Sequence, residues 1–143
     1  MRPMRLLRNL AVLVTLSAAC AYAEDLAFLA NATNTAIGKD YKAYIDKSSI
    51  HAEGAYQSAK VISIYDAPVK ASGYDGVKRM VNIFQVDCSR RVKRVTYIAF
   101  LNSDGEVIVD AKYPDAKDEG FGIGLVDMKI LPYLCPDLPL PAK

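Results

Sequence analysis

The stretch KRVTYIAFLNSDGEVIVDAK, residues 93–112, is the part of the chain that most directly indicates the fold. Residues 102–105, Asn-Ser-Asp-Gly, have the composition of a tight turn, and β-branched side chains are frequent on both sides of it. The pattern predicts a β-hairpin with strands at 93–101 and 106–112. On the first strand, the alternate positions that would share one face are Val95, Tyr97, Ala99 and Leu101.

Further strands are predicted upstream of this hairpin. Residues 41–45 and 55–65 are rich in β-branched and aromatic side chains, with a turn expected at 46–49 and a loop at 66–76. Residues 78–88 predict a strand partly covered on both sides, because apolar residues occupy both parities. The apolar residues expected broadly on one of its faces are Met80, Phe84, Val86 and Cys88.

The C-terminal part changes to the period of a helix. Residues 123–134 carry Val126, Ile130 and Leu134 at steps of four, which predicts one apolar stripe. Pro132 lacks an amide donor and its ring crowds the carbonyl four residues earlier, so we expect a kink or an early stop near Leu131.

Several strands followed by one terminal helix predict an α+β fold that is mainly β. We expect an antiparallel β-sheet with the C-terminal helix packed on one face. Cys88 and Cys135 lie 47 residues apart, and a disulfide between them would tether this helix to a central strand. Such a crosslink is worth about 4 kcal/mol in the loop-entropy account. Two free thiols are the alternative, while a metal site is disfavoured because two sulfurs and His51 fall short of four ligands.

The N-terminal residues 1–23 have the composition of a cleavable signal peptide. Three arginines without an acidic residue precede a continuous apolar and small-residue run at 10–19. Ala21 and Ala23 fit the small-residue pattern of a signal peptidase site, so we expect cleavage after Ala23. The apolar run is shorter than the roughly 20 residues that cross a bilayer, so no integral span is expected after cleavage. Lipid attachment at Cys20, which follows a lipobox-like sequence, is the alternative.

Length and charge limit the function classes. A chain of 143 residues leaves room for one folded domain. Cleavage would remove three arginines and no acidic residue, changing the formal charge from +2 to −1, so no nucleic-acid partner is expected. The expected organisation is a signal peptide at 1–23, a short N-terminal segment with a loop at 24–40, the domain at 41–135 and a Pro-rich tail at 136–143.

Several motifs, taken in order, resemble a known family. They are residues 44–50 followed by Gly54, the strand ending at 86–88, the basic residues 90–94, Tyr97, the turn at 104–105 and the closing helix that ends at Cys135. This order resembles the bacterial surface-adhesin protein E family over about residues 41–135. The resemblance implies an antiparallel sheet with a disulfide-tethered C-terminal helix, and some family members bind host extracellular-matrix proteins. The chain departs from the family pattern by having no Trp and by placing Pro132 in the closing helix.

The densest basic cluster is the candidate ligand site. Arg90, Arg91, Lys93 and Arg94 could contact an acidic polysaccharide, an acidic protein surface or anionic lipid headgroups. In an extended strand, alternation would separate Arg90 and Arg94 from Arg91 and Lys93. The alternative interpretation is a solvated strand end whose charges discourage aggregation at the sheet edge.

No catalytic set is apparent in the sequence. His51 is the only histidine, no serine lies in a nucleophile elbow, and bonded cysteines could not attack a substrate. Four acids between 110 and 119 lack the spacing of a calcium loop. We therefore expect neither an enzyme nor a cofactor or metal site.

Three hypotheses follow. The first is an exported, non-enzymatic binding domain in the periplasm, at the outer surface or secreted, with an extracellular-matrix protein, an envelope protein or an acidic polysaccharide as its partner. The second is a periplasmic inhibitor or stress accessory protein that binds a cell-envelope enzyme through residues 66–76. The third is a small hydrolase that uses His51.

Overall fold

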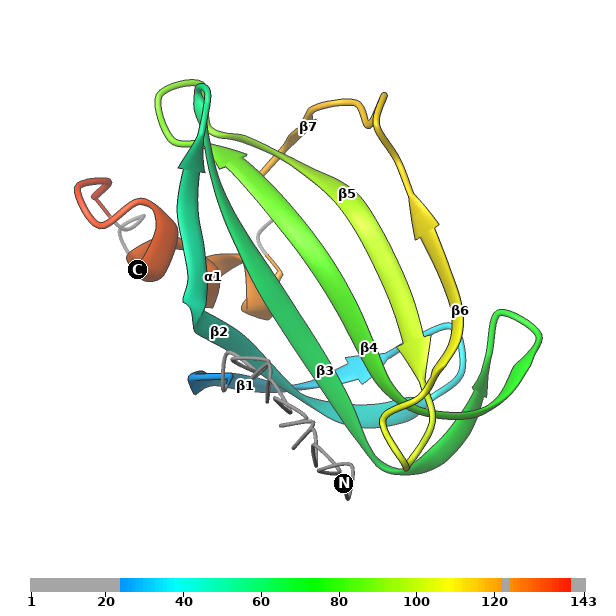
Figure 1. Ribbon diagram of the computed structural model, residues 1–143. Coiled ribbons are helices and arrows are strands. Elements are labelled where there is room, and N and C mark those ends of the chain that lie inside the picture. Colours follow the sequence, from blue (N-terminus) through cyan, green and yellow to red (C-terminus); the bar gives the residue numbers. More distant parts are fainter. Residues whose placement is uncertain (1–23, 122–123, 140–143) are drawn as a thin grey trace, which may run out of the picture.

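The computed structural model describes residues 24–121 and 124–139, and within them the chain forms one antiparallel sheet and one helix (Figure 1). The strands follow one another in space in the order β1-β2-β3-β4-β5-β6, and β7 pairs with the beginning of β5. Their bounds are β1 Leu26–Asn34, β2 Lys39–Glu53, β3 Tyr56–Ala71, β4 Tyr74–Asp87, β5 Val92–Leu101, β6 Val107–Lys112 and β7 Glu119–Gly120, with α1 at Leu125–Leu134. The predicted α+β, mainly β fold is confirmed.

Helix α1 packs on one face of the curved sheet, against β1, β2 and β3 (Figure 1). The predicted apolar stripe is the contact surface, because Ile130 and Leu134 are buried and Val126 packs beside them. They meet a buried set from the facing strands: Leu29, Ala30, Ala43, Ile45, Ala59, Val61, Phe84 and Val86. Burial of this apolar surface is what holds a ten-residue helix that would be marginal alone.

A second apolar cluster is centred on Tyr65, Ala71 and Val77, near the β3–β4 hairpin. The Tyr65 ring meets Tyr41 edge to face, and its hydroxyl accepts a hydrogen bond from Asn34 Nδ2 at 3.0 Å. The domain therefore has two packed regions, and the helix belongs to the first.

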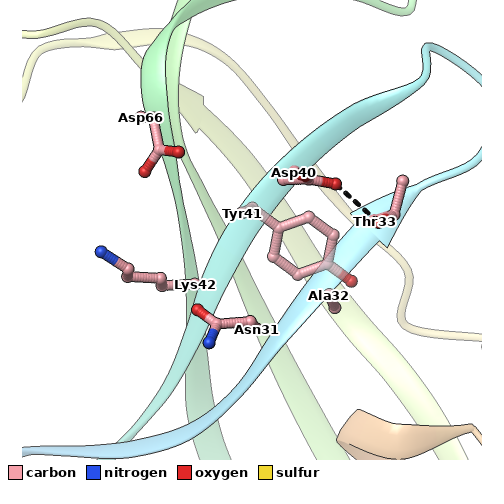
Figure 2. Close-up of a pocket in the computed structure, with 7 residues that line it drawn as sticks. All are labelled: Asn31, Ala32, Thr33, Asp40, Tyr41, Lys42 and Asp66. Carbon is pink, nitrogen blue, oxygen red and sulfur yellow. Dashed lines mark hydrogen bonds between the residues drawn. The ribbon is translucent and has the colours of Figure 1, made fainter.

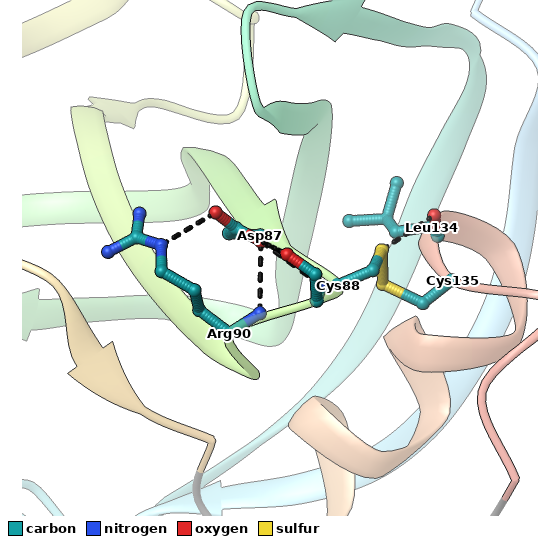
Figure 3. The surroundings of a disulfide bond; sticks show 6 residues. Asp87, Cys88, Arg90, Leu134 and Cys135 are labelled. Carbon is teal, nitrogen blue, oxygen red and sulfur yellow. Dashed lines mark hydrogen bonds and ion pairs between the residues drawn. A yellow bond between two sulfur atoms is a disulfide. The ribbon is translucent and has the colours of Figure 1, made fainter.

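The predicted disulfide between Cys88 and Cys135 is present (Figure 3). Cys88 directly follows the central strand β4, and Cys135 directly follows α1. The bond therefore joins the end of the helix to the middle of the sheet, which excludes two free thiols in this structure.

The hairpin predicted at 93–112 is also present, as β5 and β6. Asn102 organises its turn, since the Asn102 side-chain oxygen accepts hydrogen bonds from the amides of Asp104 and Glu106. Gly105 adopts φ +80°, a conformation that glycine reaches without steric cost.

Contrary to the alternation predicted for the first hairpin strand, Val95 and Tyr97 do not share one face of the sheet. Val95 pairs with Phe84 and Tyr97 pairs with Ile83, so Thr96 has no partner in β4 and forms a β-bulge. The extra residue breaks the alternation, so that Val95 packs towards the helix while Tyr97 lies on the opposite, open face.

The short element and loop expected at 24–40 are instead a nine-residue strand and a turn. The turn-prone residues Asn31 and Thr33 pair with Lys42 and Asp40 of β2, so sheet pairing overrides their local preference. The turn begins only at Asn34, whose carbonyl oxygen accepts hydrogen bonds from the following residues.

The turn expected at 46–49 is a bulge within the continuous strand β2. Asp46 Oδ1 accepts hydrogen bonds from the Ser48 amide and hydroxyl, so the local turn chemistry is present. The strand resumes pairing at His51 because β3 continues alongside it.

The loop expected at 66–76 is instead the end of a long β3–β4 hairpin. Pro68 lies in a register shift between Ile64 and Val69, where its missing amide costs no ladder hydrogen bond. The turn itself is Ser72-Gly73, and both residues have positive φ, as in a type I′ turn.

The early stop expected near Leu131 is wrong, because α1 continues to Leu134. Pro132 lies in the last turn, so its missing donor removes one helical hydrogen bond, while the Cys135 amide still donates to Leu131 O at 2.7 Å.

The residues predicted to form a signal peptide, including Ala21, Ala23 and Cys20, lie outside the described residues, as does the end of the tail. Within the ranges that are described, no helix is long and apolar enough to cross a membrane.

Candidate binding surface

A cluster of cationic, aromatic and acidic side chains gathers at the sheet end that holds the disulfide. We call it the rim cluster and define it by Tyr56, Asp87, Arg90, Arg94 and Asp118. Tyr56 begins β3, Asp87 ends β4, Arg90 lies in the β4–β5 turn, Arg94 belongs to β5 and Asp118 precedes β7. Side chains from three strands, one turn and the segment before β7 therefore meet at one end of the sheet.

Arg90 is held by three acceptors. Its Nε donates to Asp87 Oδ2 at 2.7 Å, one Nη donates to Asp118 Oδ2 at 2.9 Å, and the other donates to the Tyr56 hydroxyl at 2.9 Å. The Tyr56 hydroxyl in turn donates to the other carboxylate oxygen of Asp118 at 2.8 Å. These contacts raise the pKa of Arg90, with the Asp87 hydrogen bond first, and fix its guanidinium in one orientation.

Asp87 is buried beside this arginine and organises the β4–β5 turn (Figure 3). Its Oδ1 accepts hydrogen bonds from the amides of Ser89 and Arg90 and from the Ser89 hydroxyl. The Arg90 side-chain hydrogen bond, followed by these turn contacts, lowers the pKa of Asp87 to about 2. The carboxylate is thus ionised at neutral pH, and both of its oxygens accept hydrogen bonds from residues of the turn.

Arg94 has a different environment from Arg90. Its guanidinium carbon lies 3.9 Å from the centre of the Tyr56 ring, and its Nε donates to Gln85 Oε1 at 2.7 Å. Among the described residues, no acid forms an ion pair with Arg94. Arg94 is close enough to Asp118 to help lower the pKa of that carboxyl, after the Tyr56 and Arg90 hydrogen bonds, but no ion pair joins the two side chains. The stacked guanidinium can therefore receive an anionic group from outside the domain.

The polar contacts continue from Gln85 to His51. Gln85 Nε2 donates to Glu53 Oε2 at 2.7 Å, and His51 Nε2 lies 3.6 Å from the same oxygen. Both His51 and Glu53 are exposed at the end of the sheet, and His51 Nδ1 lies 2.8 Å from Ser49 O. This arrangement places His51 on the surface next to an acid, outside any of the pockets described below.

The four basic residues singled out in the sequence do not form one patch. Arg90 and Arg94 meet over Tyr56, whereas Lys93 lies towards the helix, forms an ion pair with Asp127 and is 5.7 Å from the Phe84 ring centre. Arg91 is exposed in the turn with φ +55°. The structure therefore brings two of the four together.

Sequence reasoning did not identify Tyr56, Gln85 or Asp118 as part of this surface. Tyr56 and Asp118 are 62 residues apart and Tyr56 and Arg90 are 34 apart, so only the sheet pairing brings them together. The one available signal was Tyr56, which follows the turn at residues 54–55 and is therefore expected at an end of the sheet.

A polar pocket of about 270 Å³ lies at the other end, over β1 and β2 (Figure 2). Thr33 Oγ1 donates to Asp40 Oδ1 at 2.6 Å within it, and Lys42 and Asp66 project from neighbouring strands. A second pocket, of about 550 Å³, borders the disulfide and Tyr133. In the part of the chain that is described, no group of three or more His, Cys, Asp or Glu residues is placed to hold a metal ion.

The fold and this surface define a class: a small antiparallel β-domain, closed by one disulfide, whose chemically distinctive groups lie on an open sheet end. The family comparison agrees with that class. A family model described as surface-adhesin protein E matches residues 33–135, and the chain belongs to this family. The resemblance inferred from the sequence is thereby confirmed. Comparisons with curated proteins and with solved structures give no significant match.

Proposed function

We propose that this chain is an exported, non-enzymatic binding domain that contacts acidic groups on host or envelope macromolecules through the rim cluster and Arg91. The observation that carries the proposal is Arg94, which lies on the Tyr56 ring without an acidic partner among the described residues. Family membership supports an adhesin-like role. The partner that we propose is an extracellular-matrix protein, an envelope protein or an acidic polysaccharide.

Export is the second part of the proposal. The disulfide supports it, since such bonds persist in oxidising compartments. We propose that residues 1–23 are removed after Ala23 and that the product acts in the periplasm, at the outer surface or after secretion. Lipid attachment at Cys20 is the alternative for its anchoring.

Intact-mass measurement of protein from fractionated cells tests the export step. The expected mass is that of residues 24–143 less two hydrogens for the disulfide. A mass that includes residues 1–23 in every fraction would contradict cleavage, and a lipid-modified chain beginning at Cys20 would establish the alternative.

Binding is tested with oxidised protein purified after export, against extracellular-matrix proteins, heparan sulfate and envelope polysaccharide. We expect at least one acidic ligand to bind, with affinity that falls as salt rises. Replacing Arg91 and Arg94 by Met should weaken it about tenfold or more, because charge-assisted hydrogen bonds are lost. The matched control replaces Lys42 and Lys70, which are exposed elsewhere, and should retain affinity.

Two outcomes would overturn the binding proposal. One is the absence of any ligand together with unchanged adherence of cells that lack the gene. The other is co-purification of a cell-wall hydrolase whose inhibition depends on the Ser72-Gly73 hairpin, which would support an inhibitor instead.

A further inference from the structure

An apolar pocket lies on the open face of the sheet beside the rim cluster. It has a volume of about 470 Å³, and its lining residues are Ile83, Thr96, Tyr97, Lys112 and Pro114. The Thr96 bulge creates it, because the extra residue turns Tyr97 to this face opposite Ile83. Apart from Lys112, the lining offers apolar and aromatic surface on the side of the sheet that α1 leaves uncovered.

Positive charge lies close to this pocket. Arg94 pairs with Gln85, two residues along β4 from Ile83, which corresponds to about 7 Å along a strand. Lys112 pairs with Tyr97 across β5 and β6 and is exposed. Neither Arg94 nor Lys112 forms an ion pair with another described residue.

The pocket also has a negative side. The Tyr97 hydroxyl donates to Asp110 Oδ2 at 3.1 Å, and Asp110 is exposed on β6. A ligand carboxylate would be repelled from Asp110 and attracted to Arg94. The two charges therefore favour one orientation of a ligand across the pocket.

We propose that this surface binds an extended peptide segment of a partner protein in which an acidic residue lies two positions from a large apolar residue. In an extended peptide, side chains two positions apart point the same way and are separated by about 7 Å, which matches the backbone separation along β4 between Gln85, the partner of Arg94, and Ile83 of the pocket. The apolar side chain fills the pocket between Ile83 and Tyr97, and the carboxylate meets Arg94. This inference rests on the proposed function and names its ligand class.

An acidic polysaccharide supplies the charge without an apolar side chain and would leave the pocket empty. An anionic lipid headgroup likewise supplies the charge without an apolar side chain at the adjacent position. A peptide meets both requirements with adjacent side chains, so the two other classes become outcomes of the test.

The test measures binding of a short fluorescent peptide centred on Glu-Ser-Phe to the oxidised, exported protein. Control peptides replace Glu by Gln or Phe by Ser, and heparan sulfate and anionic vesicles serve as competitors. We expect each peptide replacement to weaken binding about tenfold. Arg94→Met should weaken the Glu peptide to the level of the Gln peptide, whereas Lys42→Met, which removes the same charge elsewhere, should not.

Substitution in the pocket gives an independent readout. Ile83→Thr should weaken binding of both the Glu and the Gln peptide, while Val107→Thr, at an exposed strand position, should leave both unchanged. Native near-ultraviolet circular dichroism of each variant verifies the fold. Equal binding of the Glu and Gln peptides, or equal effects of the Ile83 and Val107 replacements, would overturn the inference.

These results separate the inference from the proposed function. If the chain binds matrix or envelope macromolecules through Arg94 but discriminates none of the peptides, the peptide inference fails and the proposed function stands. If the peptides bind as expected but no macromolecule does and adherence is unchanged, the proposed function fails. Displacement of the peptide by heparan sulfate alone, without dependence on the apolar residue, would assign the site to a polysaccharide.

Discussion

Asp87 is the residue through which the turn, the rim cluster and the disulfide-bearing end of β4 are connected. It precedes Cys88 and accepts hydrogen bonds from the amides of Ser89 and Arg90 and from the Arg90 side chain. Its pKa is lowered to about 2 by these contacts, from 3.8. A carboxyl whose folded pKa lies below its unfolded pKa stabilises the folded state above the unfolded value, and this contribution is lost as pH falls through the folded value.

Asp87→Asn should therefore reduce stability at neutral pH and flatten the loss of stability between about pH 4 and pH 2. Urea unfolding midpoints measured across this range for the native chain and the variant test both expectations. Asp115→Asn, at an exposed position, is the control. A variant whose pH profile runs parallel to that of the native chain would show that Asp87 contributes no pH-dependent stability.

The basic residues at 90–94 differ in the contacts that each side chain makes. The sequence places four cations within residues 90–94, and alternation in an extended strand predicts that Arg90 and Arg94 separate from Arg91 and Lys93. The structure assigns Arg90 to Asp87 and Asp118, and Lys93 to Asp127. Only Arg91 and Arg94 remain without an acidic partner among the described residues, so the charge available to a ligand is smaller than the motif indicates.

The turn of the β3–β4 hairpin is formed by two residues with positive φ, Ser72 and Gly73. Ser72 has φ +49° and Gly73 has φ +83°, so both central residues are in the left-handed region. Asn tolerates that region better than Ser. Ser72→Asn should therefore raise the free energy of unfolding by about 0.5 kcal/mol, within the range of turn and backbone effects. Thermal denaturation measures it, and a lowered melting temperature would contradict the turn assignment.

Helix α1 depends on packing rather than on intrinsic propensity. It has ten residues, contains Pro132 and has no side-chain cap at its start, yet Ile130 is only 1% exposed. Ile130→Ala should cost about 2 to 5 kcal/mol, because it removes buried contacts and leaves a cavity. Lys129→Ala, the exposed neighbour, should change stability by less than about 0.5 kcal/mol. Equal effects in chemical denaturation would place the helix away from the core.

Elements defined by local signals could be predicted from the sequence, and elements defined by distant pairing could not. The turn at 102–105 and the stripe at Val126, Ile130 and Leu134 depend on neighbouring residues, and both are present. Residues 66–76 have the composition of a loop, but the end of β3 pairs with the beginning of β4, Val69 with Val77 and Ala71 with Tyr74, which makes most of them strand. The contact between Tyr56 and Asp118 belongs to the same group, since 62 residues separate its partners.

The whole molecule has two packed regions but only one covalent crosslink. The disulfide joins α1 to β4 beside the first cluster, while the cluster of Tyr65, Ala71 and Val77 is held by the sheet alone. Reduction should therefore affect the two regions unequally. The crosslink is worth about 4 kcal/mol in the loop-entropy account, which is a large share of the roughly 5 to 15 kcal/mol that keeps a domain folded.

We expect reduced protein of native sequence to unfold at a clearly lower urea concentration than the oxidised form, with the helix opening first. Hydrogen exchange under reducing, native conditions should increase in α1, including the amide of Cys135, while the amide of Val77 remains protected. The oxidised protein is the control, because its sequence and conditions differ only in the sulfur bond. Uniform loss of protection in both regions would show that they open as one unit, and an unchanged urea midpoint would show that packing alone holds α1 against β1, β2 and β3.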